Sequence, residues 1–286
     1  MPSPFDIHQA DESLITRILS GHKGAQGLFW DSLRIPSTSV ARAIRTGQIS
    51  HLVGSKAYKD ALFRAANRLR HAHEGISRKA ARQMASELGV TFSPREMRDL
   101  VERIGRETSR KFLSEIDRSN RANFRRMIKN ASRKYRRNPT AAKLSELVGE
   151  VRPFLGLSSK MTSAIERRAA KAGLSGSRAA AFRRSSARRS SSTRAKSASR
   201  NQISVAMNKT RHEATVYAMD LGLIPRTIKK MWLDQADSKV RPRHHQQTAM
   251  GPIPFEEPYP VFGVMYPPAP EFGCRCYQRI LFPGQV

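Results

Sequence analysis

Two cysteines, two histidines and an aspartate near the end of the sequence carry side chains that bind metals or take part in catalysis. Cys274 and Cys276 stand one residue apart in the stretch EFGCRCYQRI and are the two cysteines of the chain. About 30 residues upstream, the stretch DSKVRPRHH contains Asp237, His244 and His245. Thiolate and imidazole groups together are the ligands that zinc prefers in a tetrahedral structural site.

These residue types predict a structural zinc site in which Cys274, Cys276 and His244 supply three ligands. Asp237 and His245 are the two alternatives for the fourth ligand. A disulfide between the two cysteines is disfavoured, because the ring that it closes is small and strained. Two buried cysteines beside surface histidines remain the simpler alternative, since a single Cys-x-Cys pair is a weak metal motif.

A metal-dependent nuclease that uses His244 and His245 is the alternative function. The pattern lacks a second, paired carboxylate. In an extended segment, moreover, adjacent side chains point to opposite sides and cannot serve one site. The residues therefore favour a structural role and not an enzyme, with no catalytic residue assigned.

The charge of the chain points to a polyanionic partner. Lysine and arginine total 52 against 23 aspartate and glutamate, a formal net charge of +29 over 286 residues. Such an excess repels itself unless a polyanion is near, and binding to phosphates releases counterions without any need to read a sequence. Nucleic acid is the first candidate, and an acidic membrane or an acidic protein is the alternative. Aromatic residues make up only 7% of the chain, so a platform for stacking on single strands is not favoured.

The first 220 residues predict helices, because helix-forming residues dominate and the alternation typical of strands is scarce. We expect a helix over 56–75 that Gly75 ends and a second helix capped by Ser77. Ser93 and Glu96 form a capping box at the start of a long, increasingly basic helix.

The segment FRRSSARRSSSTRAKSASR, 182–200, lies in a stretch, 167–212, that has 13 lysines and arginines and no acidic residue. It is either a solvated Ser/Arg linker or a basic helix that binds a phosphate backbone. On the second interpretation we expect these arginines to contact DNA: Arg125, Arg126, Arg133, Arg183, Arg184, Arg188, Arg189, Arg194 and Arg200.

After Pro225 prolines and aromatic residues cluster, and TIKKMWLDQ and YQRILF predict short strands. The sequence as a whole predicts a mainly α protein, in which an extended helical basic body precedes a small Pro-rich α+β lobe stapled by the Cys/His cluster. The predicted division is a helical region over 1–155, basic Ser/Arg/Ala-rich helices over 156–224 and the lobe over 225–286.

The lobe resembles the phage head morphogenesis family named for the F protein of bacteriophage Mu. The resemblance rests on Trp232, on the stretch DSKVRPRH that includes Arg241 and His244, and on YPPAPEFGCRC with its Gly273. It covers about 157–280, and Gly251 follows His244 at a longer spacing than the family usually shows.

The resemblance implies a structural minor capsid protein of a tailed phage that acts in head morphogenesis and in the packaging or ejection of the genome. Its expected place is the virion, inside the capsid near the portal vertex, in several copies. Its expected partners are the portal protein, the inner surface of the major capsid protein and packaged double-stranded DNA. We also expect the aromatic residues and prolines of the lobe to be exposed for docking on the portal or the capsid wall.

The sequence contains no run of 18 apolar residues and no signal-peptide pattern at its start, so we expect no membrane partner. We expect synthesis in the cytoplasm of the bacterial host.

Overall fold

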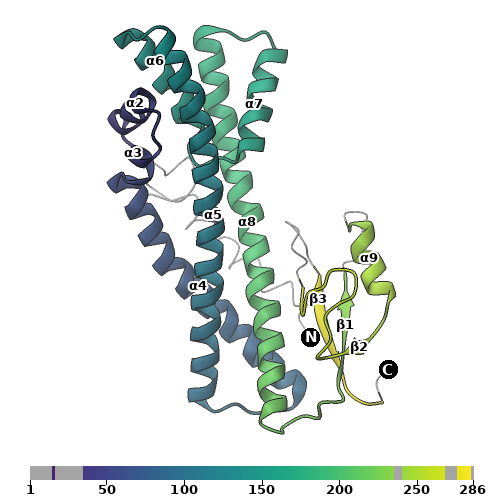
Figure 1. The fold of residues 1–286 in the computed structure, drawn as a ribbon. Coiled ribbons are helices and arrows are strands. Elements are labelled where there is room, and N and C mark those ends of the chain that lie inside the picture. Colours follow the sequence, from purple (N-terminus) through teal and green to yellow (C-terminus); the bar gives the residue numbers. More distant parts are fainter. Residues whose placement is uncertain (1–14, 17–34, 235–239, 268–275, 285–286) are drawn as a thin grey trace. The chain divides into compact units, whose positions relative to one another are not determined.

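The computed structural model describes residues 15–16, 35–234, 240–267 and 276–284. Most of them are helical, which confirms the mainly α class. The elements in chain order (Figure 1) are α2 (Ser37–Thr46), α3 (Ser50–Val53), α4 (Lys56–Leu88), α5 (Pro94–Arg137), α6 (Ala141–Val151), the 3-10 turn η1 (Arg152–Phe154), α7 (Ser159–Lys171), α8 (Gly176–Asp220), β1 (Lys229–Leu233), α9 (Pro242–Ala249), β2 (Ile253–Pro254) and β3 (Tyr277–Leu281).

The described residues form two compact units. The first unit contains residues 70–109 and the described residues from 197 onward, and the second contains the described residues up to 69 together with 110–196. Each unit therefore combines segments that are far apart in the sequence. The division of the sequence at 155/156 and 224/225 stays a prediction.

The core of the first unit joins its helices to the small lobe. Buried residues of α4, α5 and α8 pack together with Ile228 and Phe255 of the lobe. Burial of apolar side chains at about 25 cal/mol per Å² is the main force that holds such a core. Its buried residues are Ala81, Met84, Ala85, Leu88, Phe92, Leu100, Ile104, Ala214, Ala218, Met219, Ile224, Ile228 and Phe255.

The lobe contains a three-stranded antiparallel sheet with the order β2-β1-β3. Trp232 in β1 lies opposite Gln278 in β3, and Lys230 lies opposite Ile253 in β2. The two longer strands coincide with the segments in which the sequence predicts strands.

Helix α4 runs without a break through Gly75, so the predicted end at Gly75 and the predicted cap at Ser77 are wrong. A glycine inside a helix costs about 1 kcal/mol relative to alanine. The continuous helix buries Ile76, Ala80 and Ala81 on one side, and this burial outweighs that cost.

Helix α5 begins with the predicted capping box. The backbone N–H of Ser93 donates to Glu96 Oε2 at 2.7 Å, and the N–H of Glu96 donates to Ser93 Oγ at 3.3 Å. Pro94 occupies the first helical position, where its missing N–H costs nothing. This start of the helix is determined by residues that are neighbours in sequence.

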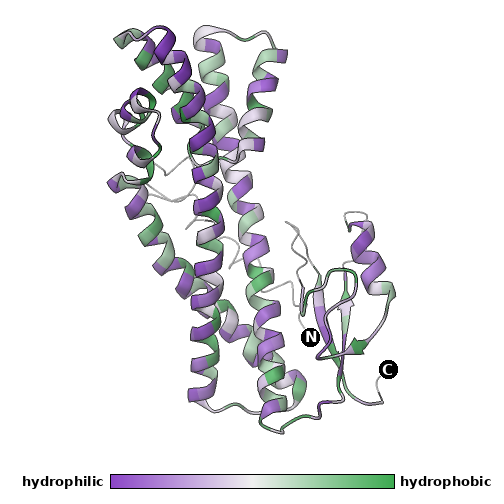
Figure 2. Cartoon of the chain, viewed as in Figure 1, coloured by the Kyte–Doolittle hydropathy of each residue, from purple (hydrophilic) through white to green (hydrophobic). Residues whose placement is uncertain are grey.

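Helix α8 contains the whole Ser/Arg segment, so the segment is helical and not a linker. Small side chains of its first half are buried, among them Ala187, Ser191 and Ala195. Figure 2 shows hydrophilic and hydrophobic residues alternating along α8. Serine favours a helix only weakly, and like charges four residues apart repel one another. Packing of this small-residue face therefore helps to hold the segment helical.

The second unit has its own aromatic and polar core. Tyr58 of α4 meets Phe124 of α5 edge to face, with 5.7 Å between the ring centroids. The Tyr58 hydroxyl donates to Asp117 at 2.6 Å, and Asn123 donates from its side chain to the carbonyl of Phe154 at 3.2 Å. These contacts tie α4, α5 and η1 together.

Candidate structural site and nucleic-acid interface

Three of the residues that carry the family resemblance meet in the interior of the lobe, and we call Trp232, His244 and Cys276 the signature cluster. Trp232 comes from β1, His244 from the first turn of α9 and Cys276 from the residue before β3. His244 Nδ1 lies 3.1 Å from Cys276 Sγ, and the ring of Trp232 lies edge-on to His244 with 6.0 Å between centroids. Their exposed fractions are 0%, 2% and 4% in chain order, so the cluster is shielded from solvent.

Aromatic rings surround this cluster. Trp232 stacks on Phe262 at 5.1 Å and meets Tyr259 edge to face at 5.0 Å. The expectation that the aromatic residues of the lobe are exposed for docking is therefore wrong for Trp232, Phe255 and Tyr259, which are buried. A small lobe can bury only a limited apolar surface, and these large rings supply much of its core.

The His244–Cys276 pair is compatible with part of the predicted zinc site. In a tetrahedral site with Zn–N and Zn–S bonds of about 2.0 and 2.3 Å, the nitrogen and the sulfur lie about 3.5 Å apart. The observed 3.1 Å requires only a small adjustment. Cys274 and Asp237 lie outside the described residues, and no group of three candidate ligands occurs within the described part of the chain. The zinc site and the staple stay predictions.

The second histidine, His245, faces a different neighbour. Successive residues on a helix point about 100° apart, and His245 Nδ1 lies 2.9 Å from Asp234 Oδ2. Asp234 also accepts a hydrogen bond from Thr248 Oγ1 at 3.0 Å. The segment is helical and not extended, yet His244 and His245 still do not share one site. This arrangement places His244 beside Cys276 and His245 beside Asp234. The fourth zinc ligand stays a prediction, because Asp237 lies outside the described residues.

Substitutions of the two adjacent histidines are expected to differ in their effect on zinc binding. If zinc is bound by the cluster, His244→Ala is expected to lose it, whereas His245→Ala is expected to keep about one zinc per chain. Elemental analysis of the purified variants after dialysis measures this difference. Equal zinc content in both variants would contradict the assignment of His244 as a ligand.

Of Arg241 and Gly273, which also carry the family resemblance, the structure describes only Arg241. Arg241 precedes α9 as its N-terminal flanking residue, with Pro242 in the first helical position. Arg241 itself is exposed. Gly273 lies outside the described residues.

Two polar residues of α8 that the sequence reasoning missed hold the outer edge of β3. Asn208 donates from Nδ2 to the carbonyl of Cys276 at 3.2 Å and accepts from the N–H of Gln278 at 3.4 Å. Arg211 donates to the carbonyl of Gln278 in β3 at 3.5 Å and is itself held by Glu87, which both of its terminal nitrogens bind at 2.9 and 2.6 Å. The unpaired backbone groups of an edge strand are thereby satisfied by side chains. Their signal in the sequence is the presence of polar residues on an otherwise apolar helical stripe.

Lys230 and His212 are two further buried polar residues that the sequence reasoning missed. Lys230 Nζ donates to the carbonyl of Met265 at 2.8 Å and lies over the ring of Tyr259. Burial lowers the pKa of Lys230 to about 8. His212 stacks on Phe255 at 4.8 Å, and burial, followed by the nearby charge of Lys230, lowers its pKa to about 4.

The predicted DNA-contacting arginines divide into internal and exposed side chains. Arg194 belongs to the internal group: its guanidinium donates to the carbonyl of Gly156, to Ser119 Oγ at 3.1 Å and to Asn120 Oδ1 at 3.4 Å. Burial lowers its pKa to about 10, so it still carries its charge at neutral pH. We therefore remove Arg194 from the set expected to contact phosphates.

Arg126 and Arg183 also serve the second unit. Arg126 donates to Ser163 Oγ at 2.7 Å and to the carbonyl of Ser159 at 3.2 Å, and Arg183 pairs with Glu166 at 3.2 Å. Both side chains are partly buried, and the contacts above tie them to α7. The exposed members of the predicted set are Arg125, Arg133, Arg184, Arg188, Arg189 and Arg200.

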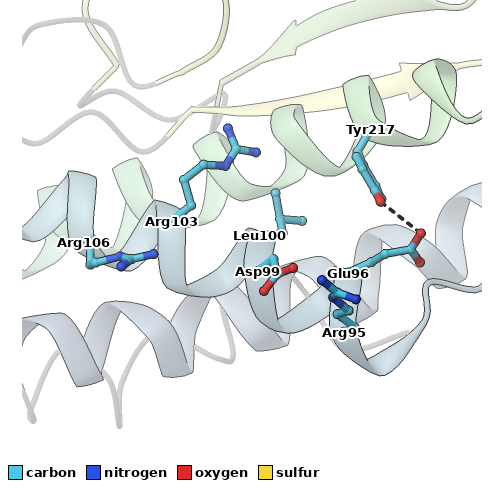
Figure 3. Close-up of a pocket in the computed structure, with 7 residues that line it drawn as sticks. All are labelled: Arg95, Glu96, Asp99, Leu100, Arg103, Arg106 and Tyr217. Carbon is cyan, nitrogen blue, oxygen red and sulfur yellow. Dashed lines mark hydrogen bonds between the residues drawn. The ribbon is translucent and has the colours of Figure 1, made fainter.

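A groove of about 530 Å³ lies on the first unit between α5 and α8. Figure 3 shows that arginine and carboxylate side chains line it together and that Tyr217 donates to Glu96, at 2.9 Å. Arg103, another lining residue, pairs with Glu213 at 3.2 Å. Because both signs of charge line this open groove, it favours neither an anion nor a cation and resembles a solvated helix surface.

No protein-family model matches the chain, and no curated protein or solved structure matches it either. Among the described residues, no helix is long and apolar enough to cross a lipid bilayer.

Proposed function

We propose that the protein is a structural minor head protein of a tailed phage that binds packaged double-stranded DNA without sequence preference and acts in head morphogenesis and genome packaging or ejection. In this role it resides inside the capsid near the portal vertex. The portal protein and the inner capsid surface are its protein partners.

One observation carries this proposal. The residues on which the family resemblance rests lie 12 to 44 positions apart, yet Trp232, His244 and Cys276 converge in one buried cluster. A chance match of scattered residues has no reason to converge in this way. The convergence supports the motif as a structural unit of the lobe, and with it the function that the resemblance implies.

The charge distribution supports the DNA contact. The exposed arginines of the predicted set lie on helices, so their side chains are presented at fixed intervals of about 1.5 Å per residue along the axis. Phosphate contacts of this kind provide affinity and position but carry no base specificity.

Duplex binding is expected to weaken steeply with salt. If five phosphates are neutralised, the slope of log K against log salt is about −4.5, and affinity falls roughly 500-fold between 50 and 200 mM monovalent salt. Fluorescence anisotropy with two unrelated 30-base-pair duplexes measures both the slope and the lack of sequence preference. Salt-independent binding would contradict the phosphate mechanism.

Location in the particle is tested on purified virions. Cross-linking followed by mass spectrometry is expected to join the lobe to the portal protein or to the inner surface of the major capsid protein. Cross-links confined to tail components or to the outer capsid surface would contradict the proposed place.

A further inference from the structure

The side-chain amide of Asn208 pairs with the start of β3 as the backbone of a neighbouring strand would. Asn208 lies in the part of α8 that belongs to the first unit. Its Nδ2 donates to the carbonyl of Cys276 at 3.2 Å, and its Oδ1 accepts from the N–H of Gln278 at 3.4 Å. All three residues are at most 4% exposed, so water does not compete for these hydrogen bonds.

The orientation of this amide is fixed by its partners. Nδ2 also donates to the carbonyl of Ser204, one turn earlier in α8, at 3.0 Å. The two carbonyls can only accept and the N–H of Gln278 can only donate, so a flipped amide would face like groups at each contact. The position therefore requires an amide. Aspartate has nearly the same shape but would place an acceptor against the carbonyls of Cys276 and Ser204.

A charged pair braces the same strand. Arg211 donates to the carbonyl of Gln278 at 3.5 Å, and Glu87 of α4 holds the guanidinium with two hydrogen bonds, at 2.9 and 2.6 Å. Glu87 also accepts from the side chain of Gln83 at 3.0 Å. Two-pronged guanidinium–carboxylate pairs have a specific geometry. The start of β3 is thus fixed against two helices of the first unit.

The hydrogen bond from Asn208 reaches the backbone of a residue in the signature cluster. Pairing between β1 and β3 begins at Tyr277, one residue after Cys276. The Asn208 amide extends the fixed backbone by one residue, to the carbonyl of the cysteine itself. Cys276 Sγ lies 3.1 Å from Nδ1 of His244, which belongs to α9. A shift of the Cys276 backbone therefore changes the distance between two predicted zinc ligands.

We propose that Asn208 is a positioning residue that holds Cys276 at the distance from His244 that a shared zinc ion requires. The Arg211–Glu87 pair supports it by bracing the same strand. Groups behind the direct ligands keep a metal site in shape, and their loss typically lowers metal affinity by about 10- to 100-fold. Helix α8 thus takes part in the predicted site without supplying a ligand. The inference goes beyond the proposed function, because it concerns the interior of the lobe and not the contact with DNA.

The first test measures the zinc affinity of the full chain by competition with a chromophoric chelator. Asn208→Asp keeps the acceptor for the Gln278 N–H and replaces the donor that faces Cys276, so zinc affinity is expected to fall by about 10- to 100-fold. Leu100→Ala is the stability control, because Leu100 is 5% exposed in the core of the same unit, away from the cluster. Its zinc affinity is expected to change by less than about threefold, since distant sites act independently.

Asn123→Asp is the matched chemical control in the second unit. Asn123 is fully buried and donates to the carbonyl of Phe154 at 3.2 Å, so this change also sets a carboxylate against a backbone carbonyl. Its zinc affinity is expected to stay within about threefold of the wild type. Circular dichroism checks that all three variants are folded.

The second test does not depend on zinc. Cys276 is the remaining thiol in a Cys274→Ser background, and in chelator-treated full chain its reaction with Ellman's reagent is expected to be slow, because it is 4% exposed. Adding Asn208→Asp is expected to raise the rate on the order of tenfold, because the loosened backbone opens the cluster more often. Adding Asn123→Asp is expected to change the rate by less than about threefold.

Two results overturn the inference. One is a zinc affinity that falls as far in Leu100→Ala as in Asn208→Asp, and the other is a Cys276 reaction rate that Asn208→Asp leaves unchanged. A wild-type chain that binds no zinc overturns the zinc part, and the reaction rate then decides whether Asn208 positions Cys276. Neither measurement involves DNA, so these failures and a failure of the proposed function are distinguishable.

Discussion

Trp232→Ala is expected to lower the free energy of unfolding of the first unit by about 3–5 kcal/mol, the range for removing a large buried aromatic side chain. Trp232 is fully buried and contacts the rings of His244, Tyr259 and Phe262. Removing the indole leaves these three rings facing a cavity. Urea denaturation followed by circular dichroism measures the loss.

Leu223→Ala is the matched control for that substitution. Leu223 is 47% exposed at the turn after α8, and an exposed apolar residue costs less than about 0.5 kcal/mol when truncated. If Trp232→Ala is as mild as Leu223→Ala, the buried cluster does not stabilise the lobe. The structural argument for the signature would then fail.

Acidification is expected to destabilise the first unit as the pH falls from about 6.5 to about 4. Burial lowers the pKa of His73 to about 4, and burial together with the charge of Lys230 lowers that of His212 to about 4. A lowered pKa means that the folded state resists protonation while the unfolded state accepts a proton below about pH 6.5. Each histidine therefore removes about 2 kcal/mol of stability at pH 5 compared with pH 7.

His212→Phe tests this pH dependence and retains a ring to stack on Phe255. The loss of unfolding free energy between pH 7 and pH 5 is expected to be about 2 kcal/mol smaller in this variant than in the wild type. The matched control is His71→Phe, because the His71 side chain is 65% exposed. An unchanged pH dependence in His212→Phe would show that His212 is protonated as easily in the folded state as in the unfolded state.

His73 is held by a specific hydrogen bond, which distinguishes it from His212. Thr108 Oγ1 donates to the carbonyl of Ile104 at 2.7 Å and lies 3.1 Å from His73 Nδ1. With its proton engaged by the carbonyl, the Thr108 hydroxyl offers an acceptor to His73 Nδ1, an arrangement that fits the neutral tautomer with its proton on Nδ1.

The errors of the sequence-based expectations share one cause. Gly75 is a local helix-ending signal, but residues that precede and follow it in the sequence are buried, and their packing keeps α4 continuous. The aromatic residues of the lobe invited a prediction of an exposed docking surface, whereas Trp232 and Tyr259 are needed inside. In both cases packing against distant residues outweighed a local or compositional signal.

The mainly helical class, the capping box of Ser93 and Glu96 and the positions of the two longer strands follow from local sequence, because helix starts and strand patterns depend on neighbouring residues. The three-dimensional contacts alone show that His244 and not His245 joins Cys276, and that Arg194 is engaged inside the second unit while Arg188 is exposed. Those outcomes depend on which side of a helix faces a partner far away in the sequence. Composition and short motifs do not determine contacts between residues that are far apart in the sequence.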